Sequence, residues 1–126
     1  GGTLEASKSS SGGFDPNDPN AMTKAYNPNP SDNSYCYELS TILSWTAGDY
    51  AIKHDVYLGT NIGSVTNATR NNPLGVLKSK AQTTTSYNTG FLNNFMVYYW
   101  RVDEVLADNT IIKGDIWTFV VYVENN

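Results

Sequence analysis

The residues of this chain that could perform nucleophilic or acid–base chemistry are few. It has one histidine, His54, and one cysteine, Cys36, among 126 residues. A hydrolase needs at least two positioned groups, a nucleophile or base and a partner that tunes it. His54 falls on the inward register of an alternating segment, which favours a buried core histidine over a general base or a metal ligand. The sequence therefore indicates no catalytic arrangement that uses Cys or His.

Paired carboxylates are the remaining route to catalysis, because a glycosidase places two of them around the bond that it cleaves. Asp103 and Glu104 are adjacent, and neighbouring residues of a strand point to opposite faces. Asp55 and Asp115 have no obvious partner in the sequence. A single cysteine makes neither a disulfide nor a structural zinc site, and no phosphate-binding glycine motif is present. We expect no enzymatic activity, no cofactor and no metal site.

Aromatic side chains offer a different chemistry, the binding of sugars. The chain contains nine Tyr, four Phe and three Trp, and only 16% of its residues are charged. An aromatic ring can pack against the C–H face of a sugar while nearby polar side chains hydrogen-bond its hydroxyls. The net charge of −4 comes with scattered Lys and Arg residues, so nucleic acid is not an expected partner. No apolar run approaches the roughly 20 residues that cross a bilayer, so no membrane partner is expected.

Two groups of aromatic residues could form a sugar-binding surface, and the first lies on two predicted strands. Tyr57 and Tyr99 would lie on the outer face of one sheet, and side by side if their two strands are neighbours, with Asp55, Arg101 and Asp103 at their edges. The alternative interpretation is structural, because cross-strand tyrosine pairs also stabilise ordinary sheets.

The second group comes from two turns that should meet at one end of the molecule. It consists of Tyr35, Tyr37 and Phe95. Burial of these rings under that end of the molecule is the alternative. Tyr50, in a turn at the opposite end, is expected to stand alone.

The elements that must position these residues are short strands. From Lys24 onward, runs that alternate with period two are separated by turn residues, as in an all-β domain. The first predicted strand ends at a turn over residues 27–33, and the later strands cover residues 42–45, 52–58, 74–81, 83–87, 96–105 and 116–123. The strands at 42–45 and 52–58 are predicted to be antiparallel neighbours. Residues 64–70 could form one helical turn, but they lack the apolar face of a stable helix.

The domain organisation follows from composition. Residues 1–23 are rich in Gly and Ser and contain a repeated Asp-Pro-Asn, which is typical of a flexible linker or N-terminal extension. Residues 24–126 are predicted to form one domain, and we expect it to be a monomer.

Three strings of residues resemble the fibronectin type III-like modules of large secreted bacterial proteins. They are HDVYLGT at residues 54–60, YYWRVDEV at residues 98–105 and GDIWTF at residues 114–119. The resemblance implies an all-β, antiparallel β-sandwich of the immunoglobulin or fibronectin type III kind. It also implies that Tyr98 is the corner tyrosine, hydrogen-bonded back to the backbone, and that Trp45, Trp100, Phe119 and Trp117 fill the core. Such modules often accompany polysaccharide-degrading catalytic domains.

The sequence departs from this family pattern at aromatic positions. Tyr35, Tyr37, Tyr50 and Phe95 stand where such modules usually carry small or aliphatic residues. Bulky rings that a sandwich does not require favour a binding role over a plain spacer.

These observations lead us to expect a non-catalytic carbohydrate-binding module of a secreted, extracellular bacterial glycoside hydrolase. Its ligand would be a neutral polysaccharide of the β-glucan or cellulose type, and its second partner the catalytic domain covalently linked to it. The alternatives are a structural spacer without a ligand and a module that adheres to proteins through an exposed sheet edge.

Overall fold

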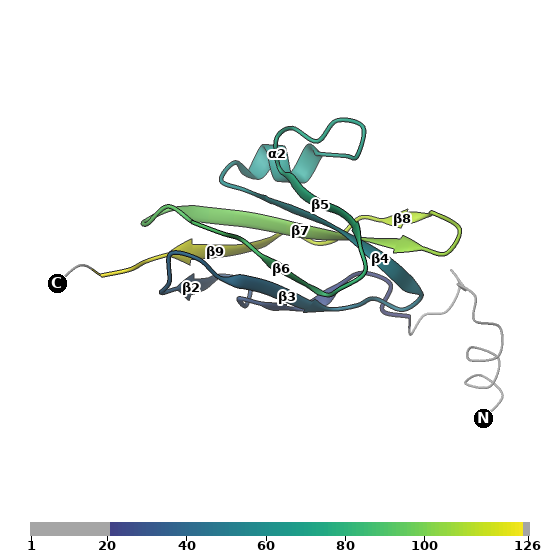
Figure 1. Cartoon of the computed structure of the whole chain (residues 1–126), viewed down its shortest axis with the longest axis horizontal. Helices are drawn as coiled ribbons and strands as arrows, with labels where there is room; N and C mark the ends of the chain where they lie inside the picture. The colour runs from purple at the N-terminus through teal and green to yellow at the C-terminus, as the bar shows by residue number, and fades with distance from the viewer. Residues whose placement is uncertain (1–20, 125–126) are drawn as a thin grey trace, which may run out of the picture.

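A computed structural model describes residues 21–124, which form two packed β-sheets (Figure 1). The elements are β1 (Tyr26–Asn29), β2 (Ser34–Cys36), β3 (Ile42–Thr46), β4 (Ala51–Gly59), α2 (Ile62–Asn67), β5 (Leu77–Gln82), β6 (Ser86–Asn88), β7 (Val97–Leu106), β8 (Ile111–Ile112) and β9 (Trp117–Val121). The predicted linker, residues 1–23, lies outside the described residues except for its last three.

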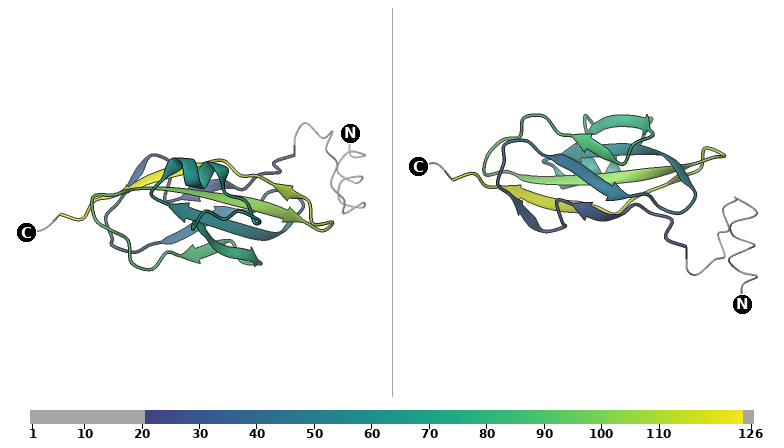
Figure 2. Two further views of the ribbon diagram at one scale, coloured as in Figure 1. Left: turned by 90° about the horizontal axis from the view of Figure 1, so that it is seen from above. Right: turned by 60° about the horizontal axis from the view of Figure 1, so that its bottom comes forward.

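The two sheets make the predicted β-sandwich. The smaller sheet has the strand order β1-β3-β6, and the larger has β2-β9-β7-β4-β5 with β8 paired to β7. The views in Figure 2 show β3 and β6 facing the long strands β4 and β7. All strand pairs are antiparallel except β2 with β9, which is parallel.

One predicted pairing is wrong, because β3 and β4 are not neighbours in a sheet. Strand β3 pairs with β1 and β6, whereas β4 pairs with β5 and β7. The turn between them crosses from one sheet to the other, so that the apolar sides of both strands meet across the core. The backbone N–H of Gly48 in this turn donates to the Glu104 carboxylate over 2.7 Å.

The first strands also differ from the prediction. Residues 27–29 belong to β1 rather than to a turn, and Ser34–Cys36 forms a strand that was not predicted. A three-residue strand is too short for period-two alternation to reveal it.

The core between the sheets contains the residues that the resemblance implied. Its main members are Leu43, Trp45, Val56, Leu58, Tyr98, Trp100, Val102, Trp117, Phe119 and Val121, with Cys36 at one side. The Tyr98 hydroxyl accepts a hydrogen bond of 2.8 Å from the Asn93 backbone N–H, which confirms the tyrosine corner. His54 is buried on the same inward face, with its Nδ1 2.5 Å from a Glu104 oxygen. This histidine is a core residue, as predicted.

Candidate functional site

The first predicted binding surface is buried, so the prediction that it forms an exposed platform is wrong. Residues 60–76, which include α2, lie across the outer face of β4 and β7 (Figure 1). We call these residues the covering segment. Tyr57 and Arg101 are each only 1% exposed to solvent. Asp55 is fully buried, and Asp103 is 3% exposed. Tyr99 is half-buried beside them. The two tyrosines do share one face of the sheet, but no sugar can reach Tyr57.

Arg101 holds the covering segment onto the sheet. Its Nε and Nη2 each donate to one oxygen of Asp103 over 2.7 Å. Its Nη1 donates to the carbonyl of Val65 over 2.6 Å, and Nη2 also donates to the carbonyl of Ala68 over 2.8 Å. The guanidinium lies 4.1 Å from the centroid of the Tyr57 ring, a cation–π contact. Arg101, Asp103 and Tyr57 therefore have a structural role.

Asp55, which is buried, forms a second ion pair with the partly exposed Arg70 of the covering segment. Arg70 donates to its two carboxylate oxygens over 2.6 and 2.9 Å, and the Ala81 backbone N–H donates over 2.7 Å. The hydrogen bonds to Asp55 raise the pKa of Arg70 above its ordinary value. Because these donors already occupy the carboxylate, Asp55 is not available to a sugar hydroxyl.

Burial of Tyr57 predicts a loss of stability at alkaline pH. Burial raises the pKa of the Tyr57 hydroxyl, and the charge of Asp103 raises it further. A pKa that is higher in the folded chain than in the unfolded one gives stability that is fully present below about pH 10 and is lost as pH rises through the folded value. In Tyr57→Phe, the melting temperature should fall less between about pH 9 and about pH 11 than in the wild type. Equal slopes in thermal unfolding across this range would contradict the prediction.

The second predicted surface is exposed, and its rings cluster as expected. Tyr35 is 60% exposed, Tyr37 67% and Phe95 60%. Tyr122, which was not predicted to be part of this surface, is 43% exposed and contacts both Tyr35 and Phe95. We call these four residues the aromatic patch. Its outward position could have been predicted, because Trp117, Phe119 and Val121 alternate toward the core and Tyr122 follows Val121.

The rings of the patch form a chain of contacts. Tyr35 and Tyr37 lie with centroids 6.0 Å apart and planes at 24°. Tyr122 stands edge-on to Tyr35 at 6.2 Å and 74°, and edge-on to Phe95 at 5.4 Å and 80°. Tyr122 therefore connects the nearly parallel pair of Tyr35 and Tyr37 to the ring of Phe95.

Three backbone segments fix the positions of these rings. In β2, Cys36 is buried, so Tyr35 and Tyr37 on either side of it point outward. The Tyr122 N–H donates to the Cys36 carbonyl over 2.9 Å, and the Phe95 N–H donates to the Val121 carbonyl over 2.8 Å. Because all three segments are hydrogen-bonded together, the patch is preorganised.

The side chain of Asn94 adds three hydrogen bonds to this arrangement. Its amide donates to the Val123 carbonyl over 2.7 Å and accepts from the Val123 N–H over 2.8 Å. The same side-chain oxygen accepts from the Phe95 N–H over 2.9 Å. One residue thus fixes both the backbone that carries Phe95 and the segment that follows Tyr122.

Tyr50 does not belong to the patch. It precedes Ala51, which pairs with Leu106 at the end of β7, whereas Phe95 precedes the start of β7. The two residues therefore lie at opposite ends of the sandwich, as predicted. Tyr50 is half-buried and has a backbone φ of 70°.

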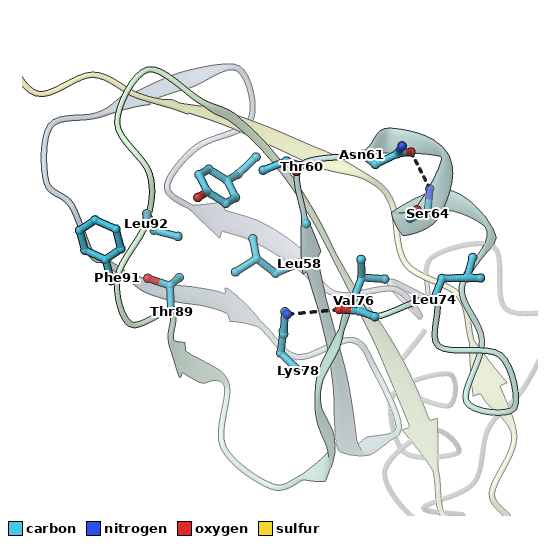
Figure 3. A pocket seen from close by; sticks show the side chains of 13 residues that line it. Leu58, Thr60, Asn61, Ser64, Leu74, Val76, Lys78, Thr89, Phe91 and Leu92 are labelled. Atoms are coloured by element: carbon cyan, nitrogen blue, oxygen red, sulfur yellow. Dashed lines mark hydrogen bonds between the residues drawn. The ribbon is translucent and has the colours of Figure 1, made fainter.

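Two surface depressions lie near the patch end of the molecule. One, shown in Figure 3, is bordered by Thr60, Lys78 and Phe91, with the Lys78 ammonium donating to the Gly75 carbonyl over 3.3 Å. The other has a volume of about 650 Å³ and is bordered by Tyr37 and Phe91. Phe91 belongs to both, and at 76% exposure it is the most exposed large apolar side chain within residues 21–124.

Between residues 21 and 124, no three His, Cys, Asp or Glu side chains gather closely enough to hold a metal ion. None of the helices in that range has the length and apolar character that a membrane span requires.

The fold is that of a fibronectin type III-like β-sandwich. A structure search found similarity to the crystal structure of a Fn3-like protein from Clostridium thermocellum, with a TM-score of 0.56 and 16% identity, covering 81% of this chain and 95% of that one. The sequence matches no protein-family model and no curated protein. The structural similarity confirms the predicted fold class.

Proposed function

We propose that this domain is a non-catalytic carbohydrate-binding module that binds a neutral polysaccharide through the aromatic patch. The observation that carries the proposal is the set of four rings, each at least 43% exposed and held in mutual contact. Contiguous exposed apolar surface of this kind marks an interaction site in a soluble domain. A spacer without a ligand has no need of it.

The chemistry of the patch fits sugars better than an apolar partner. Three of its four rings are tyrosines, whose hydroxyls can hydrogen-bond while the ring faces pack against C–H groups. Tyr35 and Tyr37, stacked with planes 24° apart and both more than half exposed, provide aromatic surface on which a sugar ring can pack. The chain carries only eight Lys and Arg residues and a net charge of −4, so a neutral polymer suits it better than an acidic one.

The setting of the module is part of the proposal. A domain that binds but does not catalyse is useful when it is linked to an enzyme that acts on the same polymer. We therefore propose a secreted bacterial parent protein with a polysaccharide-degrading catalytic domain, in which this module acts as a monomer.

Alanine substitutions in the patch test the binding site. In Tyr35→Ala and Tyr37→Ala, affinity for the best ligand among xyloglucan, mixed-linkage glucan, cellulose and xylan should fall roughly tenfold or more, as for truncation of a central interface ring. Affinity gel electrophoresis and isothermal titration calorimetry would measure the loss. Because both side chains are more than half exposed, the thermal stability of the variants should stay close to that of the wild type.

Tyr50→Ala is the matched control, since it removes the same ring at the opposite end of the sandwich. It should leave the affinity unchanged. If the wild type binds none of the four polysaccharides, the proposal fails and the spacer role takes its place.

A further inference from the structure

The four-ring patch is not flat, and this limits what it can bind. Only Tyr35 and Tyr37 have nearly parallel planes, whereas Tyr122 is turned by 74° from Tyr35 and by 80° from Phe95. A crystalline polysaccharide presents one plane and needs several coplanar rings. A single glycan chain can instead lie on two rings and contact others along its side.

A continuation of this surface lies beyond Tyr37. The Tyr37 ring contacts Tyr35 of the patch and also borders the 650 Å³ depression, whose border includes Phe91. The polar residues Glu38, Ser40 and Asn88 line the same depression. A surface that combines aromatic rings with polar groups suits a chain of sugars, whose C–H faces pack on rings and whose hydroxyls form hydrogen bonds.

Both rings are carried by one rigid unit of backbone. The Leu92 N–H donates to the Leu39 carbonyl over 2.7 Å, and the Thr89 N–H donates to the Thr41 carbonyl over 3.0 Å. The residues on either side of Phe91 are thus tied to the segment that follows Tyr37. A binding surface fixed in this way loses little conformational entropy when a ligand binds.

The carboxylate of Glu38 at the border of the depression favours neutral over acidic glycans. Glu38 is the one charged residue on its border, and its carboxylate has no protein partner within residues 21–124. A carboxylate can accept hydrogen bonds from sugar hydroxyls, but it repels uronic acids and sulfated sugars. The surface therefore complements a neutral chain.

We propose that the binding surface runs from the aromatic patch past Tyr37 to Phe91, and that its ligand is a single neutral glycan chain rather than a crystalline surface. This inference rests on the proposed function, and it restricts the class of ligand from neutral polysaccharides in general to single neutral chains. Phe91 supplies a distal sugar-binding position, which only a chain long enough to pass Tyr37 reaches.

Phe91→Ala, with Phe91→Tyr as its matched control, tests the proposal in calorimetric titrations with cello- and xylo-oligosaccharides. Relative to the wild type, Phe91→Ala should bind the hexasaccharide roughly tenfold more weakly and the disaccharide equally well. Phe91→Tyr retains the ring and should bind both ligands as the wild type does. Equal affinity of Phe91→Ala and the wild type for the hexasaccharide would overturn the distal position.

Pull-down assays test the kind of polymer. The wild type should bind soluble mixed-linkage glucan or xyloglucan in preference to microcrystalline cellulose and polygalacturonate. Equal or stronger retention on microcrystalline cellulose or polygalacturonate would overturn the single neutral chain. If Tyr35→Ala and Tyr37→Ala lose binding while Phe91→Ala does not, the proposed function stands and this inference fails. If the wild type binds no glycan, both fail.

Discussion

Arg101→Met should lower the free energy of unfolding by about 3–5 kcal/mol, the usual loss when one partner of a buried ion pair is removed. The substitution leaves the Asp103 carboxylate, 3% exposed, without its two guanidinium hydrogen bonds. It also removes the donors to the Val65 and Ala68 carbonyls. Urea unfolding and a melting temperature lowered by more than about 10 °C would record the effect.

Two further variants make this result interpretable. Arg101→Lys keeps the charge but not the two parallel hydrogen bonds, so it should be destabilised less than Arg101→Met. Lys24→Met removes an ion pair to Asp115 whose side chains are 51% and 58% exposed, and it should change stability by less than about 1 kcal/mol. If Arg101→Met unfolds at the same urea concentration as Lys24→Met, the anchoring role of Arg101 is wrong.

Gly114→Ala should have the next largest effect, a loss of about 2–4 kcal/mol from steric overlap and a broken hydrogen bond. A Cβ at this position would lie 2.0 Å from the Val102 carbonyl oxygen, within the backbone of β7. Relief of that overlap requires the Gly114 backbone to move away, although its N–H donates to Asp103 over 2.9 Å. The shift in the urea midpoint at an unchanged m-value measures the loss.

Gly63→Ala is the control for Gly114→Ala. A Cβ on Gly63 in α2 would lie 3.2 Å from the Asn61 side-chain oxygen, and alanine favours helix. This variant should differ from the wild type by less than about 1 kcal/mol. Similar unfolding midpoints for the two variants would show that the close packing of Gly114 against β7 does not limit stability.

The long strands could be predicted from the sequence because their alternation is long enough to be seen. In β7 the inward residues Tyr98, Trp100 and Val102 alternate with Tyr99 and Arg101, and the structure keeps this register. The tyrosine corner at Tyr98 and the core positions of Trp45, Trp100, Trp117 and Phe119 followed instead from the family resemblance. The parallel strand β2 was not predicted, because three residues after a turn carry no periodic signal.

The burial of the first candidate surface could not be predicted for a different reason. Charged residues that face away from a core are normally in water, so Asp55, Arg101 and Asp103 suggested an exposed face. They can be buried because each forms an ion pair. Asp55 pairs with Arg70, and Arg101 pairs with Asp103. The covering segment is polar. Of its three buried apolar side chains, Val65 and Ala68 lie in and directly after a six-residue helix, and Val76 is at the segment's end. A pattern so short does not reveal a covering element.

The clustering of Tyr35, Tyr37 and Phe95 was predictable because topology alone brings the two turns together. The bridging position of Tyr122 depends on the parallel pairing of β2 with β9, and no local pattern predicts which edge a short strand joins. The neighbouring depression and Phe91 likewise depend on long-range hydrogen bonds between residues 39–41 and 89–92.

The outer face of the larger sheet thus has two parts, one buried and held by ion pairs and the other carrying exposed rings. Where α2 covers β4 and β7, each charge has a partner, and a single change disturbs the fold. Along β2 and the end of β9, the rings of Tyr35, Tyr37 and Tyr122 are exposed, so their replacement costs little stability. Under the proposed function, ligand specificity can therefore evolve, or be engineered, by changes on one half of the face while the other half keeps the domain folded.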